Sequence, residues 1–485
     1  MLGKEAKDAA EAALAAARRY GVTYADVRIV TIHDQRIMAE DRRIERIADS
    51  ESQGIGVRVV VDGAWGFAAT CAVAGSDAEA TAVAAIEVGK ASAALRKGAP
   101  VALADEPPHR DRYVTPRVTD PFEVAIERKV AVLLAAHEEI LQVTGVRKAH
   151  SFLHFKRELK TFANTDGSYL EMDILTSACG LCATAVDDGD AQTRKYEPPQ
   201  INNGFELVER ADLVGNAPRV GAEAVEKLRA PLVTSGPMDL ILLPSHMWLT
   251  IHESVGHATE LDRVIGMEES LSGGSFATLD QLGRLRYGSP LVSFRVLNTR
   301  PGLLASTGYD DDGVECQDWD IVRDGILVGY STNREVARAM GETRSRGSCH
   351  ADSWSSIPIL RMPNLCLMPG RERLSLDDLI ADTRQGILID GDGSFSIDQK
   401  RMNFQIGGDA FWEIRDGKRM GMLRGVTYQA ITPDFWGSCD AICDESEWRP
   451  YGATNCGKGD PMQIGQMTTG CAPARLRAVQ VRRAE

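Results

Sequence analysis

The 485-residue chain lacks the long apolar runs that membrane and secreted proteins carry. None of its apolar runs approaches the ~18 residues that a membrane-spanning helix needs. Its start is too rich in charge and alanine for the apolar core of a secretory signal peptide. These absences exclude an integral membrane protein, and we expect a cytoplasmic chain with no membrane partner.

The chain also lacks an excess of positive charge and a dense set of cysteines. Its net charge is −14, whereas nucleic-acid binding depends on Lys and Arg residues that neutralise phosphates. We therefore expect no direct nucleic-acid contact. The ten cysteines are scattered along the chain, unlike the framework of a small secreted domain, and we expect reduced thiols.

Helical and strand-like stretches alternate in blocks, without regular β-α-β repeats. This pattern predicts an α+β fold, with N-terminal helix/β-sheet domains followed by a strand-rich C-terminal domain. Five prolines in residues 99–121 indicate a linker between units. We therefore expect three domains, at residues 1–115, 116–231 and 232–485.

Hydrophobic periodicity and turn residues predict the individual elements. The first domain has expected helices over residues 3–20 and 77–97, and expected strands over 25–32, 35–40, 43–47, 54–61 and 65–70. The second has expected helices over 122–143 and 217–228, expected strands over 145–155, 159–164 and 169–186, and a polar loop over 187–203. In the third, Asp416, Gly417 and Lys418 predict a hairpin turn between strands 403–415 and 419–427.

The third domain carries the strongest chemical signal, LTIHESVGHATELD, in which His252 and His257 bracket Glu253. Neutral imidazole is a good zinc ligand, and a catalytic zinc keeps about three protein ligands so that water fills the fourth position. Zinc lowers the pKa of that water to roughly 7, and a neighbouring carboxylate can take its proton as it attacks a carbonyl. The motif predicts a zinc peptidase site with Glu253 as the base.

The spacing of the two histidines differs from the familiar H-E-x-x-H, whose histidines share one face of an α-helix. His252 and His257 are five residues apart, which places their rings about 140° apart on a regular α-helix. A π-type bulge restores a shared face, and Gly256 would ease that distortion or end the helix. The spacing therefore predicts a π-bulge or a helix break at Gly256. A solvated helix face is the alternative interpretation, and a third ligand must lie elsewhere.

Three further stretches are candidates for chemistry. Cys179 and Cys182 form a C-x-x-C pattern, but an alternating strand points them to opposite faces, which favours a structural role. The acidic stretch at Asp310 to Asp312 does not alternate as a calcium loop does, so we expect a solvated turn, with amine binding or loop ordering as the alternative. Cys456 lies in the glycine-bounded TNCGKG, where Lys458 would favour a thiolate, although a buried structural cysteine is also expected.

Taken together, several motifs resemble the TldD branch of the TldD/PmbA metallopeptidase family. The similar stretches are LTIHESVGHATELD, YDDDGVECQ, RMPNLCLMPG, TNCGKGDPMQIGQ and, near the start, YADVRIV and GIGVRVVVDGAWGFAAT. The resemblance implies His252, His257 and Cys456 as zinc ligands and Glu253 as the base. It also places Glu260 beside the ligands without direct contact with the metal.

The same resemblance implies a peptidase that hydrolyses unfolded or unstructured peptides, such as the leaders of modified peptides. The peptide would bind as an added β-strand, so that main-chain hydrogen bonds give affinity with little side-chain selectivity. The chain would form a homodimer, or a heterodimer with a metal-less homologue. The alternative hypothesis is a non-catalytic interaction or regulatory subunit of such an assembly.

Overall fold

The N-terminal half of the protein forms one long, curved sheet that is antiparallel except for the parallel pair of β4 and β6. The computed structural model describes residues 3–484. The strand order is β3-β2-β1-β5-β6-β4, and β7 pairs with β6. These strands are β1 (Tyr24–Glu40), β2 (Arg43–Val61), β3 (Ala64–Thr70), β4 (Arg110–Val114), β5 (Val146–Asn164), β6 (Tyr169–Asp187) and β7 (Asp190–Tyr196).

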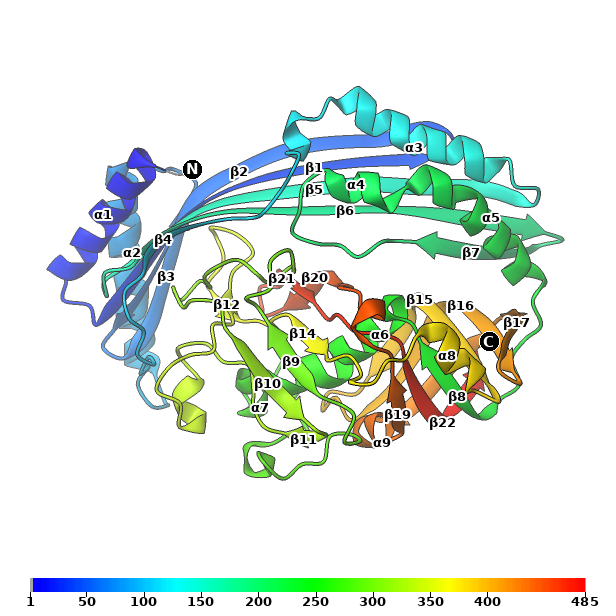
Figure 1. Ribbon diagram of the computed structural model, residues 1–485. Coiled ribbons are helices and arrows are strands. Elements are labelled where there is room, and N and C mark those ends of the chain that lie inside the picture. Colours follow the sequence, from blue (N-terminus) through cyan, green and yellow to red (C-terminus); the bar gives the residue numbers. More distant parts are fainter. Residues whose placement is uncertain (1–2, 485) are drawn as a thin grey trace.

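Five helices cover this sheet, in two groups (Figure 1). The helices are α1 (Lys4–Arg19), α2 (Gly75–Leu95), α3 (Ile126–Leu141), α4 (Glu206–Ala211) and α5 (Leu213–Arg229), with a 3-10 turn at Pro121–Glu123. Helices α1 and α2 lie at one end, whereas α3, α4 and α5 lie along the convex face. Alanines at helical spacing let α1 approach the sheet closely, since Ala6, Ala9, Ala13 and Ala17 are all buried. Among residues 3–484, no helix is long and apolar enough to cross a membrane.

Several predicted strands merge into longer ones. Residues 25–32 and 35–40 are parts of the single strand β1, and residues 145–155 and 159–164 are parts of β5. Two predicted connections contain strands: residues 99–121 include β4, and residues 187–203 include β7. Strands β1 and β5 pair along their length, so strands that come before and after residues 99–121 belong to the same sheet. Strand β4 pairs with β6, whose residues lie about 60 positions later, whereas β7 follows β6 in a hairpin and is hidden because its residues are mostly polar.

The C-terminal half lies under the concave face of the long sheet (Figure 1). Strand β16 pairs with both β15 and β18, so the path β15-β8-β22-β18-β16 closes on itself. The main strands here are β8 (Gly236–Leu242), β15 (Gln385–Ile397), β16 (Asn403–Arg415), β17 (Lys418–Leu423), β18 (Val426–Ile431), β19 (Cys439–Ile442) and β22 (Ala474–Arg483). The expected turn at Asp416 and Gly417 joins β16 and β17, whereas the predicted strand over 419–427 is split between β17 and β18.

Smaller elements complete this half. The helices are α6 (Pro244–Ile251), α7 (Leu261–Val264), α8 (Leu376–Ala381) and α9 (Thr432–Gly437), with 3-10 turns at Leu279–Gln281, Ala337–Met340 and Glu445–Glu447. The short strands are β9 (Phe294–Leu297), β10 (Asp318–Arg323), β11 (Ile326–Leu327), β12 (Cys349–His350), β13 (Ile359–Leu360), β14 (Leu365–Leu367), β20 (Gly452–Lys458) and β21 (Gln463–Thr468). Strands β20 and β21 form a separate hairpin. The mixture of helix and strand, with a strand-rich C-terminal half, confirms the predicted α+β class.

The acidic stretch is buried between the two halves, so the expected solvated turn is wrong. Asp310, Asp311 and Asp312 are all less than a tenth exposed. Asp312 accepts a hydrogen bond of 2.6 Å from Arg58 of β2, and Asp311 accepts one of 2.7 Å from Lys160 of β5. Buried charges need such partners because the interior solvates them poorly. The stretch therefore fastens the C-terminal half to the long sheet.

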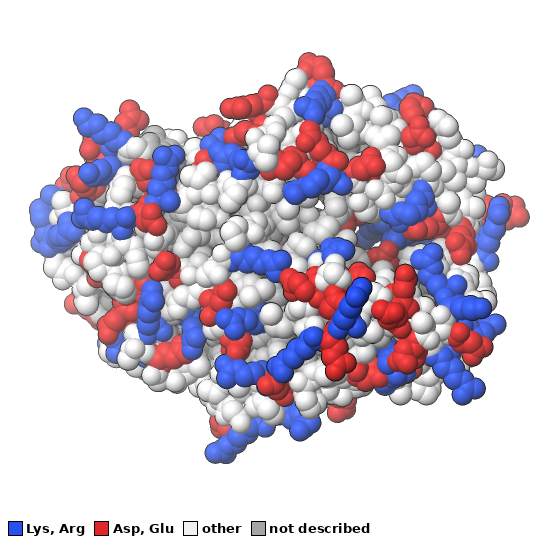
Figure 2. Space-filling model, in the orientation of Figure 1, with Lys and Arg blue, Asp and Glu red and all other residues white. Residues whose placement is uncertain are grey.

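Charges on the outer surface are mixed. On the face drawn in Figure 2, Lys and Arg side chains lie interspersed with Asp and Glu side chains. Such mixing weakens the long-range field that would attract a polyanion.

Candidate metal centre

A π-helical turn brings the two histidines together. Helix α6 continues into a π-helix at His252–Gly256, and the N–H of His257 donates to the carbonyl oxygen of His252. This i to i+5 bond turns the chain about one residue further than an α-helix does. The two imidazole rings consequently lie 4.7 Å apart between centroids, at 85°. The π-bulge predicted from the histidine spacing is confirmed.

Gly256 is required by packing rather than by its backbone conformation. Its φ of −57° is ordinary for a helix, so the expected easing of strain is not its role. A Cβ atom added at Gly256 would lie 2.2 Å from the sulfur of Met362. Glycine therefore allows the turn to approach the segment that follows β13 (Ile359–Leu360).

Cys456 joins the histidines from strand β20, far away in the sequence. One ligand atom from each of His252, His257 and Cys456 lies within 4.8 Å of the others, and all three side chains are buried. Cys456 Sγ lies 3.6 Å from His257 Nε2. We call these three residues the metal cluster. The glycine-bounded loop predicted around Cys456 is instead a strand of the β20-β21 hairpin.

The electrostatics of the metal cluster favour a thiolate. Burial raises the pKa of the Cys456 thiol, but the neighbouring His252 and His257 outweigh burial and lower that pKa to about 5. Burial lowers the pKa of His257, yet Cys456 and Glu260 raise it overall to about 9. The Nδ1 atom of His252 is buried and has no hydrogen-bond partner among residues 3–484. Two imidazoles and a thiolate form a donor set that suits zinc.

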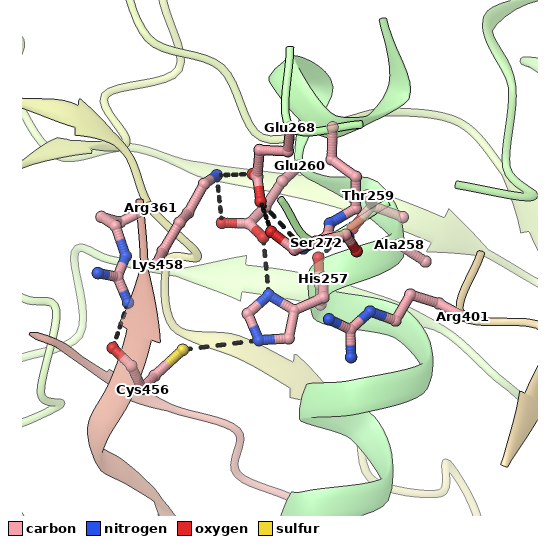
Figure 3. Close-up of polar contacts among 12 residues, drawn as sticks. His257, Ala258, Thr259, Glu260, Glu268, Ser272, Arg361, Arg401, Cys456 and Lys458 are labelled. Atoms are coloured by element: carbon pink, nitrogen blue, oxygen red, sulfur yellow. Dashed lines mark hydrogen bonds and ion pairs between the residues drawn. The ribbon is translucent and has the colours of Figure 1, made fainter. Parts of the chain in front are cut away.

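Glu260 and Lys458 lie on the side of the His257 ring that faces away from Cys456 (Figure 3). His257 Nδ1 lies 2.7 Å from Glu260 Oε2, which leaves Nε2 directed at Cys456. Lys458 Nζ forms ion pairs with Glu260, Asp262 and Glu268 at 2.7 to 3.1 Å. The charge of Lys458 is therefore paired with these carboxylates. The sequence predicted that Lys458 favours the thiolate of Cys456, but His252 and His257 do so instead. A carboxylate behind a ligating histidine fixes its orientation and tautomer.

Arg361 positions the strand that carries Cys456. Its guanidinium donates to the carbonyl oxygen of Cys456 at 2.5 Å and to that of Gln463 at 2.8 Å. One side chain thus ties together both strands of the β20-β21 hairpin. Arg361 opens the run RMPNLCLMPG, whose role the sequence did not reveal. The similarity of this run to the family was the only feature of the sequence that pointed to Arg361.

Glu253 faces a cavity at the metal cluster and is paired with an arginine. The cavity has a volume of about 450 Å³, and its lining includes all three cluster residues, Glu253 and Arg401. Arg401 Nη1 donates to Glu253 Oε2 at 2.5 Å. Sequence reasoning missed Arg401, because 148 residues separate it from Glu253 and no motif links them.

The C-x-x-C pair does not join this site. Cys179 and Cys182 both lie in β6, where Cys179 is buried and Cys182 is half-buried, and neither forms a disulfide. Among residues 3–484, the metal cluster is the one group of three or more potential ligands close enough to share an ion. The structural role expected for the pair is consistent with this placement.

Comparison with known proteins decides the family. The chain matches models of three domains: PmbA/TldA metallopeptidase domain 1 over residues 25–89, the central domain over 119–232 and the C-terminal domain over 235–482. The chain belongs to the PmbA/TldA metallopeptidase family. The resemblance predicted from the motifs is thereby confirmed, and the metal cluster lies within the family's C-terminal domain.

Relatives and solved structures agree with this assignment. A metalloprotease of Methanothermobacter thermautotrophicus is 26% identical over 92% of both chains. A zinc metalloprotease TldD homolog of Saccharolobus solfataricus is 22% identical over 77% of this chain and 78% of the relative. The crystal structure of TldE from Thermococcus kodakarensis has a TM-score of 0.76 at 15% identity, and the match covers 98% of this chain and 100% of that one. At such low identity this structure shows that the fold is shared.

Proposed function

We propose that the protein is a zinc-dependent peptidase that hydrolyses unfolded or unstructured peptides, with leader peptides of modified peptides as one example. His252, His257 and Cys456 would hold the metal, and Glu253 would act as the base. The observation that carries this proposal is the convergence of two imidazoles and one thiolate beside Glu253 at a single cavity. The name of the Saccharolobus solfataricus relative supports zinc as the metal.

The chemistry follows from the side chains around the cavity. Bound zinc would polarise the peptide carbonyl and make water more acidic. Glu253 would accept a proton from the attacking water and later give it to the leaving amine as the C–N bond breaks. Arg401 borders the same cavity as Glu253 and donates to its carboxylate.

The substrate class is supported by the hairpin that carries Cys456. Strand β20 pairs only with β21 among residues 3–484, and its residues 453 and 455–457 line the cavity, so we propose that an extended peptide adds to its other edge. Such an edge selects for main-chain hydrogen bonds and therefore for unfolded segments.

We further propose that the protein works in the cytoplasm as a homodimer or as a heterodimer with a metal-less homologue.

The test of the proposed function is Glu253→Gln. This variant should keep about one zinc per chain while kcat on an unstructured fluorogenic peptide falls by roughly 100 to 10,000-fold, the usual contribution of a general base. Glu138→Gln is the matched control, because Glu138 lies on the exposed surface of α3 and pairs with Arg42. Zinc content by mass spectrometry and initial rates are the two readouts.

Two outcomes would overturn the proposal. Native cleavage rates in Glu253→Gln would remove the base from the mechanism. If the zinc-loaded wild type cleaves no member of a library of unstructured peptides, and biological activity survives in a His252→Ala, His257→Ala double variant, the protein is a non-catalytic subunit instead.

A further inference from the structure

Arg401 reaches the site from an unusual backbone conformation. It lies in the turn between β15 and β16, with a φ of 64°. That left-handed conformation is unfavourable for a non-glycine residue. The backbone is held there on both sides: the Arg401 N–H donates to the carbonyl oxygen of Asp398 at 3.0 Å, and its carbonyl oxygen accepts from the hydroxyl of Thr432 at 2.8 Å. The turn thus directs a long cationic side chain into the metal cavity.

The hydrogen bonds of Arg401 are incomplete. Its Nη1 donates to Glu253, while its Nε–H is buried and has no acceptor among residues 3–484. The side chain is only 14% exposed and borders the same cavity as the metal cluster. In Figure 3 it extends toward His257. A guanidinium has five N–H donors, and within residues 3–484 that of Arg401 donates a hydrogen bond only to Glu253.

A second buried arginine, Arg194, is paired more completely than Arg401. Arg194 donates to Glu223 at 2.7 Å, to Asp409 at 2.8 Å and also to Asp390, so three carboxylates surround its charge. Arg401 has a hydrogen bond to a single carboxylate. Burial lowers the pKa of Arg401, and the carboxylate of Glu253 only partly opposes this effect. The cation at the metal cavity is therefore poorly compensated.

We propose that Arg401 is a catalytic residue that stabilises the negative charge developing on the carbonyl oxygen of the scissile peptide bond. This inference rests on the proposed peptidase function. A preorganised, largely buried cation stabilises such a charge more than water does, because it needs no reorganisation during the reaction. Because Arg401 hydrogen-bonds to Glu253, the two side chains can act on the same substrate carbonyl, with Glu253 near the attacking water and Arg401 near the carbonyl oxygen.

The proposed hydrolysis begins with attack of water on the scissile carbonyl. The oxygen of water bonds to the carbonyl carbon while Glu253 accepts one proton from that water. The π electrons of the C=O bond move to the carbonyl oxygen, whose charge Arg401 stabilises. When the carbonyl re-forms, the C–N bond breaks and the amine leaves with the proton from Glu253. The new carboxylic acid gives its remaining proton to solvent.

The experiment compares Arg401→Ala, Arg401→Gln and Arg401→Lys in the zinc-loaded protein. We expect kcat on an unstructured fluorogenic peptide to fall by about 100 to 1,000-fold in Arg401→Ala and Arg401→Gln, with KM changed by less than about threefold. Arg401→Lys should recover part of kcat, because lysine supplies the charge without the planar geometry. Added guanidinium should also partly restore Arg401→Ala. Arg415→Ala is the matched control, since Arg415 is an exposed arginine of the neighbouring β16.

Two further measurements separate catalysis from folding and from substrate binding. Zinc content and the melting temperature show whether each variant is folded, and Arg401→Gln serves if the alanine variant is unstable. Fluorescence anisotropy of a labelled peptide, in Glu253→Gln with and without Arg401→Gln, should give dissociation constants within about twofold of each other. This equality is expected because Arg401 acts on the transition state.

The inference is overturned if folded Arg401 variants keep the native kcat, or if they lose only affinity and show a raised KM. In both cases the wild type would still cleave and Glu253→Gln would still be inactive, so the proposed peptidase function would stand. A wild type that cleaves nothing would overturn the peptidase function and this inference together.

Discussion

Two buried charged clusters lie in the C-terminal half, and they differ in how completely their atoms are paired. The acidic cluster, Asp310 to Asp312, hydrogen-bonds to Arg58, Lys160 and several backbone N–H groups. In the metal cluster, the Nδ1 atom of His252 has no hydrogen-bond partner within residues 3–484. The pKa of the Cys456 thiol is lowered to about 5 by its histidine neighbours, against the effect of burial. Only the metal cluster lines the 450 Å³ cavity.

The difference indicates which buried charges are available for chemistry. A fully paired cluster stabilises one arrangement of the chain, because any change leaves an uncompensated charge. A cluster with unpaired atoms at a cavity can bind a ligand at little cost to the fold. We therefore expect changes to the acidic cluster to affect stability, and changes to the metal cluster to affect zinc and activity.

The largest expected effect on the metal cluster comes from Cys456→Ala. Removal of the thiolate leaves two protein ligands, and we expect zinc affinity to fall by more than the ~100-fold that loss of an outer partner costs. Peptide cleavage should fall with the zinc content. Zinc per chain after dialysis and the melting temperature of the metal-free protein test this expectation. A variant that retains tightly bound zinc would show that Cys456 is not a ligand.

Asp312→Ala should lower the stability of the fold and leave zinc binding unchanged. It leaves Arg58 buried with Asp26 as its remaining ion-pair partner within residues 3–484, and breaking a buried pair costs about 3–5 kcal/mol of unfolding free energy. Zinc content should stay near one per chain in the folded protein. Chemical denaturation measures the loss, with Asp105→Ala as the control, because the exposed pair of Asp105 with Arg338 contributes about 1 kcal/mol or less. Loss of zinc without loss of stability would contradict the proposed contrast.

A smaller effect is expected for Glu260→Gln, which weakens the hold on His257 without removing a ligand. Loss of an outer-shell carboxylate typically lowers metal affinity about 10 to 100-fold. Competition with a zinc chelator measures this change. An unchanged zinc affinity would mean that the 2.7 Å contact between Glu260 and His257 does not orient the ring.

The smallest expected effect is on the pH dependence of zinc binding. In the metal-free protein, a pKa of about 9 keeps His257 protonated at pH 7, whereas a pKa of about 5 keeps Cys456 ionised. Zinc needs a neutral imidazole, so binding between pH 6 and 8 should release about one proton and affinity should rise about tenfold per pH unit. Above pH 9 the dependence should flatten. Calorimetry in buffers of different ionisation enthalpy counts the protons, and a count near zero would contradict the assignment.

The sequence predicted the local part of the site better than its distant partners. Five-residue spacing between His252 and His257 was enough to predict the π-turn, because helix geometry depends on neighbouring residues. Cys456 followed from family resemblance alone, since no periodicity connects it with residues about 200 positions earlier. Arg401 gave no signal, because its contact with Glu253 exists only after β15 and β16 have folded against α6.

The same limit explains the errors in the fold. Residues 310–312 were expected in solvent because three adjacent carboxylates normally seek water. Their cations, Arg58 and Lys160, come from strands more than 150 residues away, so the burial could not be read locally. Strand β4 was missed for a similar reason, since its partner residues in β6 lie about 60 positions later. Strand β7 forms a hairpin with the end of β6 and was missed because its short, mostly polar sequence resembles a loop.

The most direct test of the central claim is anomalous X-ray diffraction at the zinc edge from crystals of the zinc-loaded protein. The account predicts one strong anomalous peak in contact with His252, His257 and Cys456, with a zinc to sulfur distance of about 2.3 Å. A peak elsewhere, or one beyond bonding distance of Cys456, would contradict the proposed metal centre.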